Sequence, residues 1–92
     1  AGNKKKFDQP VLVNVDALDV WRVGFITQES TDHFGLNEHV TVYVPHSYAI
    51  SGITYMVPLS RIKRLPPGVS ASEAMKYTVS GGVTDVDDDP ET

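Results

Sequence analysis

Three histidines are the residues of this chain best suited to metal binding. His33, His39 and His46 are separated by five and six intervening residues. These spacings match none of the compact ligand patterns that hold metal ions in proteins. Exposed or hydrogen-bonded histidines are the ordinary alternative. The sequence therefore predicts no metal site, and we expect no cofactor.

Two pairs of carboxylates, Asp16 with Asp19 and Glu29 with Asp32, have the residue types that acid–base catalysis uses. Both pairs lie in polar turn segments, where acidic residues are common without any catalytic role. The run Ser80-Gly81-Gly82 lacks the lysine and the preceding glycine of a phosphate-binding loop, and it is better explained as the end of a helix. No catalytic residue is predicted, and we expect the protein not to be an enzyme.

Composition narrows the possible partners. The chain has 92 residues, no cysteine and a net charge of −4, so it forms one small domain without disulfides or zinc-thiolate sites. Nucleic-acid binding needs a basic face, and apart from the N-terminal lysines the basic residues cluster only at Arg61, Lys63 and Arg64. No apolar run approaches the roughly 18 residues needed to cross a bilayer. We expect no nucleic-acid partner.

The central structural element is predicted in residues 40–58. Residues 40–44 and 53–57 each alternate β-branched or aromatic side chains with other residues, which is typical of half-buried strands. Pro45 and Pro58 end the two runs, because proline has no N–H to give to a ladder. The pattern predicts a β-hairpin with a loop of about seven residues.

Two further strands are predicted before this hairpin, at residues 11–15 and 20–27. In the second, Trp21, Val23 and Phe25 share one face, and their large apolar area indicates that this face points inward.

The remaining segments give weaker signals. Gly24 in mid-strand indicates a bulge or the close approach of another backbone. Residues 28–39 are a polar connection in which only Phe34 and Leu36 look anchored. Residues 62–65 are predicted to be a short basic edge strand, since charged residues there discourage unwanted pairing.

One helix is predicted near the C-terminus. Ser70 and Glu73 fit a capping box, apolar residues follow at helical spacing, and Gly81-Gly82 stops the helix. We therefore expect an α+β domain over residues 7–84: a mostly antiparallel sheet of about five strands, arranged as a meander or partly open barrel, with the helix packed on it. Residues 1–6 are expected to be a flexible basic segment, and residues 85–92 a disordered acidic tail.

The loop of the central hairpin is the candidate interaction site. Tyr48 and Ile50 are apolar residues at a predicted surface position, where they would touch a partner protein, a second copy or a membrane. The alternative is that both fold back as a lid over the core. The candidate residues are Pro45, His46, Ser47, Tyr48, Ala49, Ile50, Ser51 and Gly52.

A second candidate contact is the lysine run Lys4, Lys5 and Lys6. Each lysine would contribute about 1 kcal/mol near an anionic membrane surface. A solvated tail is the alternative.

Several blocks of the sequence form a recognisable series in their order and spacing: Phe7 with 10–13, then 20–27, 42–45, 51–52 with 56–58, and 73–74 with 80–83. They resemble the soluble part of family 502 of domains of unknown function, to which the plant continuous-vascular-ring (COV-like) membrane proteins belong. The resemblance covers residues 7–83. The loop after Pro45 is about one residue shorter than is usual in the family, and the segment 65–72 is about two residues longer.

The resemblance implies a membrane protein with two transmembrane helices upstream of this domain. An even number of spans would return this domain to the side of the membrane that holds the N-terminus, and a lysine-rich segment just after the spans favours the cytoplasmic side. The expected function is that of a soluble interaction or structural module without catalytic activity, whose partner is an unknown protein or a second copy. Two alternatives remain: a binder of a small apolar ligand or lipid head group, with a cavity lined by Trp21, Phe25 or Met56, and a self-assembly module.

Overall fold

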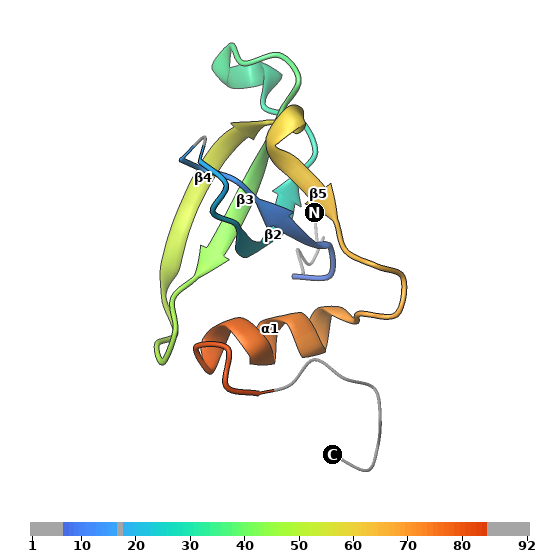
Figure 1. The fold of residues 1–92 in the computed structure, drawn as a ribbon. Helices are drawn as coiled ribbons and strands as arrows, with labels where there is room; N and C mark the ends of the chain where they lie inside the picture. Colours follow the sequence, from blue (N-terminus) through green and yellow to red (C-terminus); the bar gives the residue numbers. More distant parts are fainter. Residues whose placement is uncertain (1–6, 17, 85–92) are drawn as a thin grey trace, which may run out of the picture.

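The computed structural model describes residues 7–16 and 18–84, which form a five-stranded antiparallel sheet and one α-helix (Figure 1). This architecture confirms the predicted α+β fold with a C-terminal helix. The flexible segment and the acidic tail predicted for residues 1–6 and 85–92 lie outside the described residues. The elements are β1 (Pro10–Val13), β2 (Arg22–Gln28), a 3-10 helix η1 (Asp32–Phe34), β3 (His39–Pro45), β4 (Gly52–Pro58), a second 3-10 helix η2 (Leu59–Arg61), β5 (Ile62–Arg64) and α1 (Ala71–Val79).

The sheet is strongly curled. Its strand order is β4-β3-β2-β1-β5, so β4 and β5 are the two edges. Only the three residues of η2 join one edge strand to the other, and β5 then pairs with β1, with Val13 opposite Ile62. A flat sheet of this order could not be closed by so short a connection, so the strands wrap round as a partly open barrel.

The predicted hairpin is confirmed. Every residue of β3 pairs with one of β4, and Val42 lies opposite Tyr55. The N–H of His46 donates to the carbonyl oxygen of Ser51 over 2.8 Å and closes the loop. The loop has six residues, 46–51, one fewer than expected.

Both faces of the sheet are covered. One face carries the main core, here called the valine face, on which Val15, Tyr55 and Ile62 also pack. On the opposite face Phe25 is completely buried, and Phe7 lies against it and against Tyr43, with ring centroids 6.0 and 5.1 Å apart. The residues of the valine face are Val11, Val13, Ile26, Val40, Val42, Val44 and Val57.

The prediction that Trp21, Val23 and Phe25 form the inward set is therefore only partly right. Phe25 is buried, whereas Trp21 and Val23 are half-buried. The larger cluster lies on the other face, which holds Gly24 between buried valines: a Cβ there would lie 2.5 Å from Val42 Cγ1. Close approach, the second expectation for this glycine, is only partly right: the nearest atoms belong to the side chains of Val42 and Val13, and the nearest backbone atom, the carbonyl oxygen of Tyr43, would lie 3.4 Å from the added Cβ.

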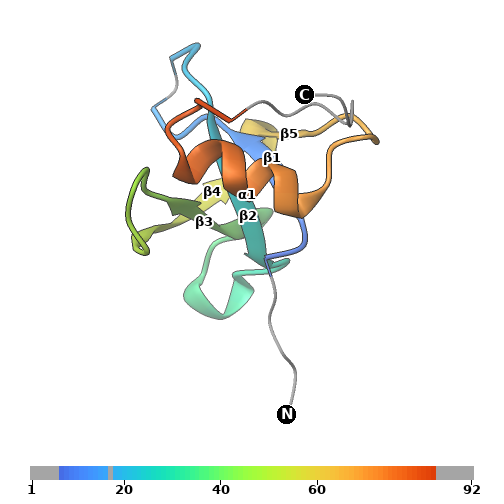
Figure 2. The same ribbon diagram turned by 90° about the horizontal axis from the view of Figure 1, so that it is seen from below.

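Helix α1 crosses the lower end of the sheet, over β2 and β3, and buries Ala74 (Figures 1 and 2). Its capping box is formed as predicted: Ser70 Oγ accepts from the Glu73 N–H over 3.1 Å, and Glu73 Oε1 accepts from the Ser70 N–H over 3.2 Å. Gly81 and Gly82 have φ of 74° and 87°, the left-handed conformation expected where a helix stops.

The connection between β2 and β3 differs from the prediction. The completely buried residue of this connection is Thr31. The hydroxyl group of Thr31 donates to the carbonyl oxygen of Leu36 over 3.1 Å and to that of His39 over 3.3 Å. Leu36 is half-buried, but Phe34 is 64% exposed and is not an anchor. The hydrogen bonds of a buried threonine therefore stabilise this turn, in which the large apolar side chain of Phe34 is exposed.

Candidate functional site

The hairpin loop, residues 46–51, joins β3 to β4 at the end of the sheet where α1 lies. Of the candidate residues Pro45–Gly52, the first and last are the ends of the two strands. Gly52 is required at its position, because an added Cβ would press on the carbonyl oxygen of Val44 and lie 2.7 Å from the ring of Tyr43. The start of β4 is thus fixed by this close approach.

Two hydrogen bonds attach the hairpin loop to the last turn of α1. The N–H of Tyr48 donates to the carbonyl oxygen of Val79 over 2.6 Å. The hydroxyl of Ser47 donates to the carbonyl oxygen of Thr78 over 2.9 Å. Because the last carbonyl groups of a helix have no partner within the helix, the loop acts as a cap contributed from a distant part of the chain.

The apolar side chains of the loop point to solvent. Tyr48 is 76% exposed and Ile50 is 103% exposed, so neither covers the core as a lid. Tyr48 also has φ of 55°, the left-handed conformation that a bulky side chain rarely adopts. Hydrogen bonds to α1 therefore hold the backbone of the loop, while its two large apolar side chains remain largely exposed.

A shallow apolar groove begins at the ring of Tyr48 and runs along α1. Its volume is about 430 Å³. Met75 and Val79, both half-buried, supply its apolar floor from α1. Its lining residues, which we call the Tyr48 groove, are Tyr48, Met75, Lys76, Val79, Ser80 and Thr84.

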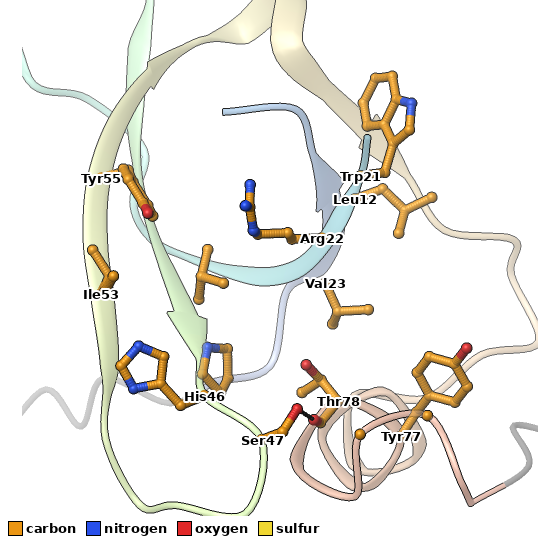
Figure 3. A pocket seen from close by; sticks show the side chains of 14 residues that line it. Leu12, Trp21, Arg22, Val23, His46, Ser47, Ile53, Tyr55, Tyr77 and Thr78 are labelled. Atoms are coloured by element: carbon orange, nitrogen blue, oxygen red, sulfur yellow. Dashed lines mark hydrogen bonds between the residues drawn. The ribbon is translucent and has the colours of Figure 1, made fainter. Parts of the chain in front are cut away.

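A larger cavity of about 680 Å³ opens where the curled sheet faces α1 (Figure 3). Arg22 and Tyr55 line it from the valine face, whereas Leu12 and Val23 line it from the face turned toward α1. Of the residues expected to line a ligand cavity, Trp21 does so, but Phe25 and Met56 do not. The cavity is thus partly the one expected from the sequence.

Two of the residues that line this cavity, Trp21 and Arg22, are engaged with neighbouring carboxylates. Arg22 forms an ion pair with Asp16 over 3.2 Å. Trp21 Nε1 donates to Asp19 Oδ1 over 2.8 Å, and Lys63 Nζ lies 4.4 Å from the centre of the indole ring. The carboxylate pair Asp16 and Asp19 thus contacts the side chains of Arg22, the first residue of β2, and of Trp21, which directly precedes it.

The histidines lie at separate places. His39 Nδ1 is 2.7 Å from the carbonyl oxygen of Asn37, His46 Nδ1 is 3.2 Å from Ser51 Oγ, and His33 packs on Phe34. Among residues 7–16 and 18–84, no group of three potential ligands could hold a metal ion.

Sequence reasoning missed the residues of α1 that hold the loop. Thr78 and Val79 act through their backbone carbonyl groups, 31 residues beyond Ser47 and Tyr48. No side-chain pattern encodes such a contact. The nearest signal was Gly81-Gly82, which places the end of the helix but not its neighbour in space.

The candidate membrane-surface contacts Lys4, Lys5 and Lys6 lie outside the described residues. Within the described part of the chain, no helix has the length and apolar character needed to cross a bilayer.

A comparison with protein families finds a match. Residues 1–52 match the model of the family described as "Protein of unknown function (DUF502)". The match covers more than half of the chain and extends from the N-terminus through β3 and the hairpin loop to the first residue of β4. Searches of curated proteins and of solved structures give no significant match.

Proposed function

The chain belongs to the DUF502 family, and from that premise we propose that it is a soluble interaction module of a membrane protein and acts by contact and not by catalysis. The wider context is the one that the sequence resemblance implies: a COV-like protein with two spans upstream and this domain on the cytoplasmic side. The contact surface consists of the hairpin loop and the Tyr48 groove. Its partner is another protein.

The observation that carries this proposal is an exposed apolar tip on a fixed backbone. Tyr48 and Ile50 are largely exposed, while two hydrogen bonds to α1 hold the loop that bears them. A preorganised loop loses little conformational entropy on binding, so its exposed apolar area is available to stabilise a complex.

The backbone of Tyr48 supports the same conclusion. A non-glycine residue in the left-handed conformation costs about 1–2 kcal/mol. Asparagine or glycine would occupy this position with less strain, yet the chain has a tyrosine there. Strain retained at an exposed aromatic residue is typical of a binding site.

Proximity labelling of the full-length protein in its own membrane tests the proposal. The double variant Y48S/I50S should lose neighbours that the unchanged protein labels. F34S is the matched control, because Phe34 is an exposed apolar residue in η1, at the opposite end of the sheet (Figure 1). Equal labelling by both variants would overturn the proposal.

The 680 Å³ cavity favours a second candidate function, binding of a small apolar ligand or lipid head group. Trp21 is the only tryptophan of the chain and lines the cavity, so its fluorescence reports on occupancy. Titration with a short-chain phospholipid should shift the emission saturably. An unchanged emission spectrum would remove this candidate.

A further inference from the structure

Among residues 7–16 and 18–84, no strand pairs with the outer side of β4, which is an edge of the sheet. The strand is seven residues long, Gly52–Pro58, and none of them is charged. Ile53 and Met56, on opposite faces of the strand, are 45% and 42% exposed. Proteins usually blunt such edges with charges, bulges or a covering segment, because unpaired backbone groups bind other strands.

The pairing with β3 shows which backbone groups of β4 are free. His46 donates to Ser51, and hydrogen-bonded and non-hydrogen-bonded pairs alternate along an antiparallel ladder. Thr54 and Met56 therefore direct their N–H and C=O groups away from β3, and the described residues provide no partner for them. The residues that face β3 are Ile53, Tyr55 and Val57.

The other edge of the sheet is protected. Strand β5 has three residues, of which Lys63 and Arg64 are charged. Pro66 and Pro67 follow almost directly and remove further N–H donors. Since β5 is protected against pairing with other strands and β4 is not, β4 is the edge suited to pairing with another chain.

We propose that β4 pairs with β4 of a second copy of this chain, antiparallel and about a two-fold axis at Tyr55. In this register Thr54 of each copy exchanges two hydrogen bonds with Met56 of the other. The N–H of Gly52 donates to the carbonyl oxygen of Pro58, whose missing N–H falls at the end of the ladder. The two sheets become one.

The sequence of β4 fits its own copy better than it fits β5. The self-paired register uses the whole strand, brings no like charges together and places Ile53 beside Val57 of the other copy. Apolar and β-branched neighbours of this kind stabilise a sheet. A two-fold contact also closes on itself because it uses both β4 edges, whereas head-to-tail pairing of β4 with β5 would always leave one β4 edge free and extend into larger assemblies. This pairing does not depend on the hairpin loop or on the function proposed above.

Sedimentation of the 92-residue chain tests the pairing. The weight-average mass should rise from 10.1 kDa toward twice that value with concentration. T54P removes an N–H that only the second copy would use and should keep the chain monomeric, whereas T54V retains that N–H and should behave like the unchanged chain. A chain that stays at 10.1 kDa throughout, or a T54P variant that still dimerises, would overturn the proposal.

Two double variants test the register. T54K/M56K places like charges opposite each other across the two-fold axis and should abolish the dimer. T54K/M56E alters the same exposed positions but places opposite charges there, so it should retain a dimer that added salt weakens. Circular dichroism verifies that both are folded. Equal masses for the two variants, or assemblies beyond the dimer, would contradict this register.

Discussion

The N–H of Tyr48 and the carbonyl oxygen of Val79 lie 2.6 Å apart and join the hairpin loop to the end of α1. Because the carbonyl group belongs to a helix terminus, the direction of the loop depends on where the helix ends. The candidate interaction surface is thus built from both segments, and a change in the helix should be felt in the loop.

Removal of the helix cap should loosen that surface. We expect S70A to lower the free energy of unfolding by about 1 kcal/mol, because Ser70 Oγ no longer accepts from the Glu73 N–H. Amide exchange at Tyr48 should accelerate by more than the global loss accounts for. Urea unfolding and hydrogen exchange measure the two effects. S72A is the control and should change neither; unchanged exchange in S70A would show that the loop is independent of the helix.

The apolar tip should contribute little to stability. Y48S/I50S removes exposed side chains and should change the free energy of unfolding by no more than about 0.5 kcal/mol. V42A, in the completely buried part of the valine face, should lose about 2 kcal/mol. Thermal and urea unfolding provide the comparison. A loss of several kcal/mol in the double variant would mean that the tip packs as a lid.

The strain at Tyr48 should be removable. Y48N should raise the free energy of unfolding by about 1 kcal/mol, because asparagine tolerates a φ of 55° better than tyrosine does. I50N, in the same loop at a residue without positive φ, should give no such gain. A lower midpoint temperature for Y48N would indicate that the ring of Tyr48 stabilises the fold.

Close approach at Gly52 should make it intolerant of any side chain. G52A places a methyl group against the Val44 carbonyl and the Tyr43 ring, and we expect a loss of about 1–3 kcal/mol. G68A is the matched control, since nothing lies within 4 Å of its added Cβ. It should be neutral or stabilising by up to about 1 kcal/mol. Equal stability of the two variants would contradict the structure at the start of β4.

The hairpin and the helix were predictable because their signals are local. Period-two alternation marks β3 and β4, and Ser70 and Glu73 specify the start of α1 through contacts within four residues. The end of α1 followed from Gly81-Gly82, whose left-handed conformation few other residues adopt. Such elements are determined by residues that are close to them in the sequence.

The core face and the site were not predictable in the same way. Phe25 and its neighbour Ile26 are both buried, on opposite faces of the sheet. Because both faces are covered, the alternation of side chains along the strand could not show which of the two belongs to the main cluster. The contact of Tyr48 with Val79 is made by backbone atoms and leaves no trace in residue type. Such features depend on how distant segments meet.

The position of β1 between β2 and β5 has a consequence for the order of folding. Val13 pairs with Arg22, nine residues on, but also with Ile62, 49 residues on. During synthesis β1 cannot complete its pairing until β5, the last strand of the sheet, has left the ribosome. Long-range closure of this kind slows folding, so the step that completes the sheet should come late and leave β1 briefly open to a chaperone.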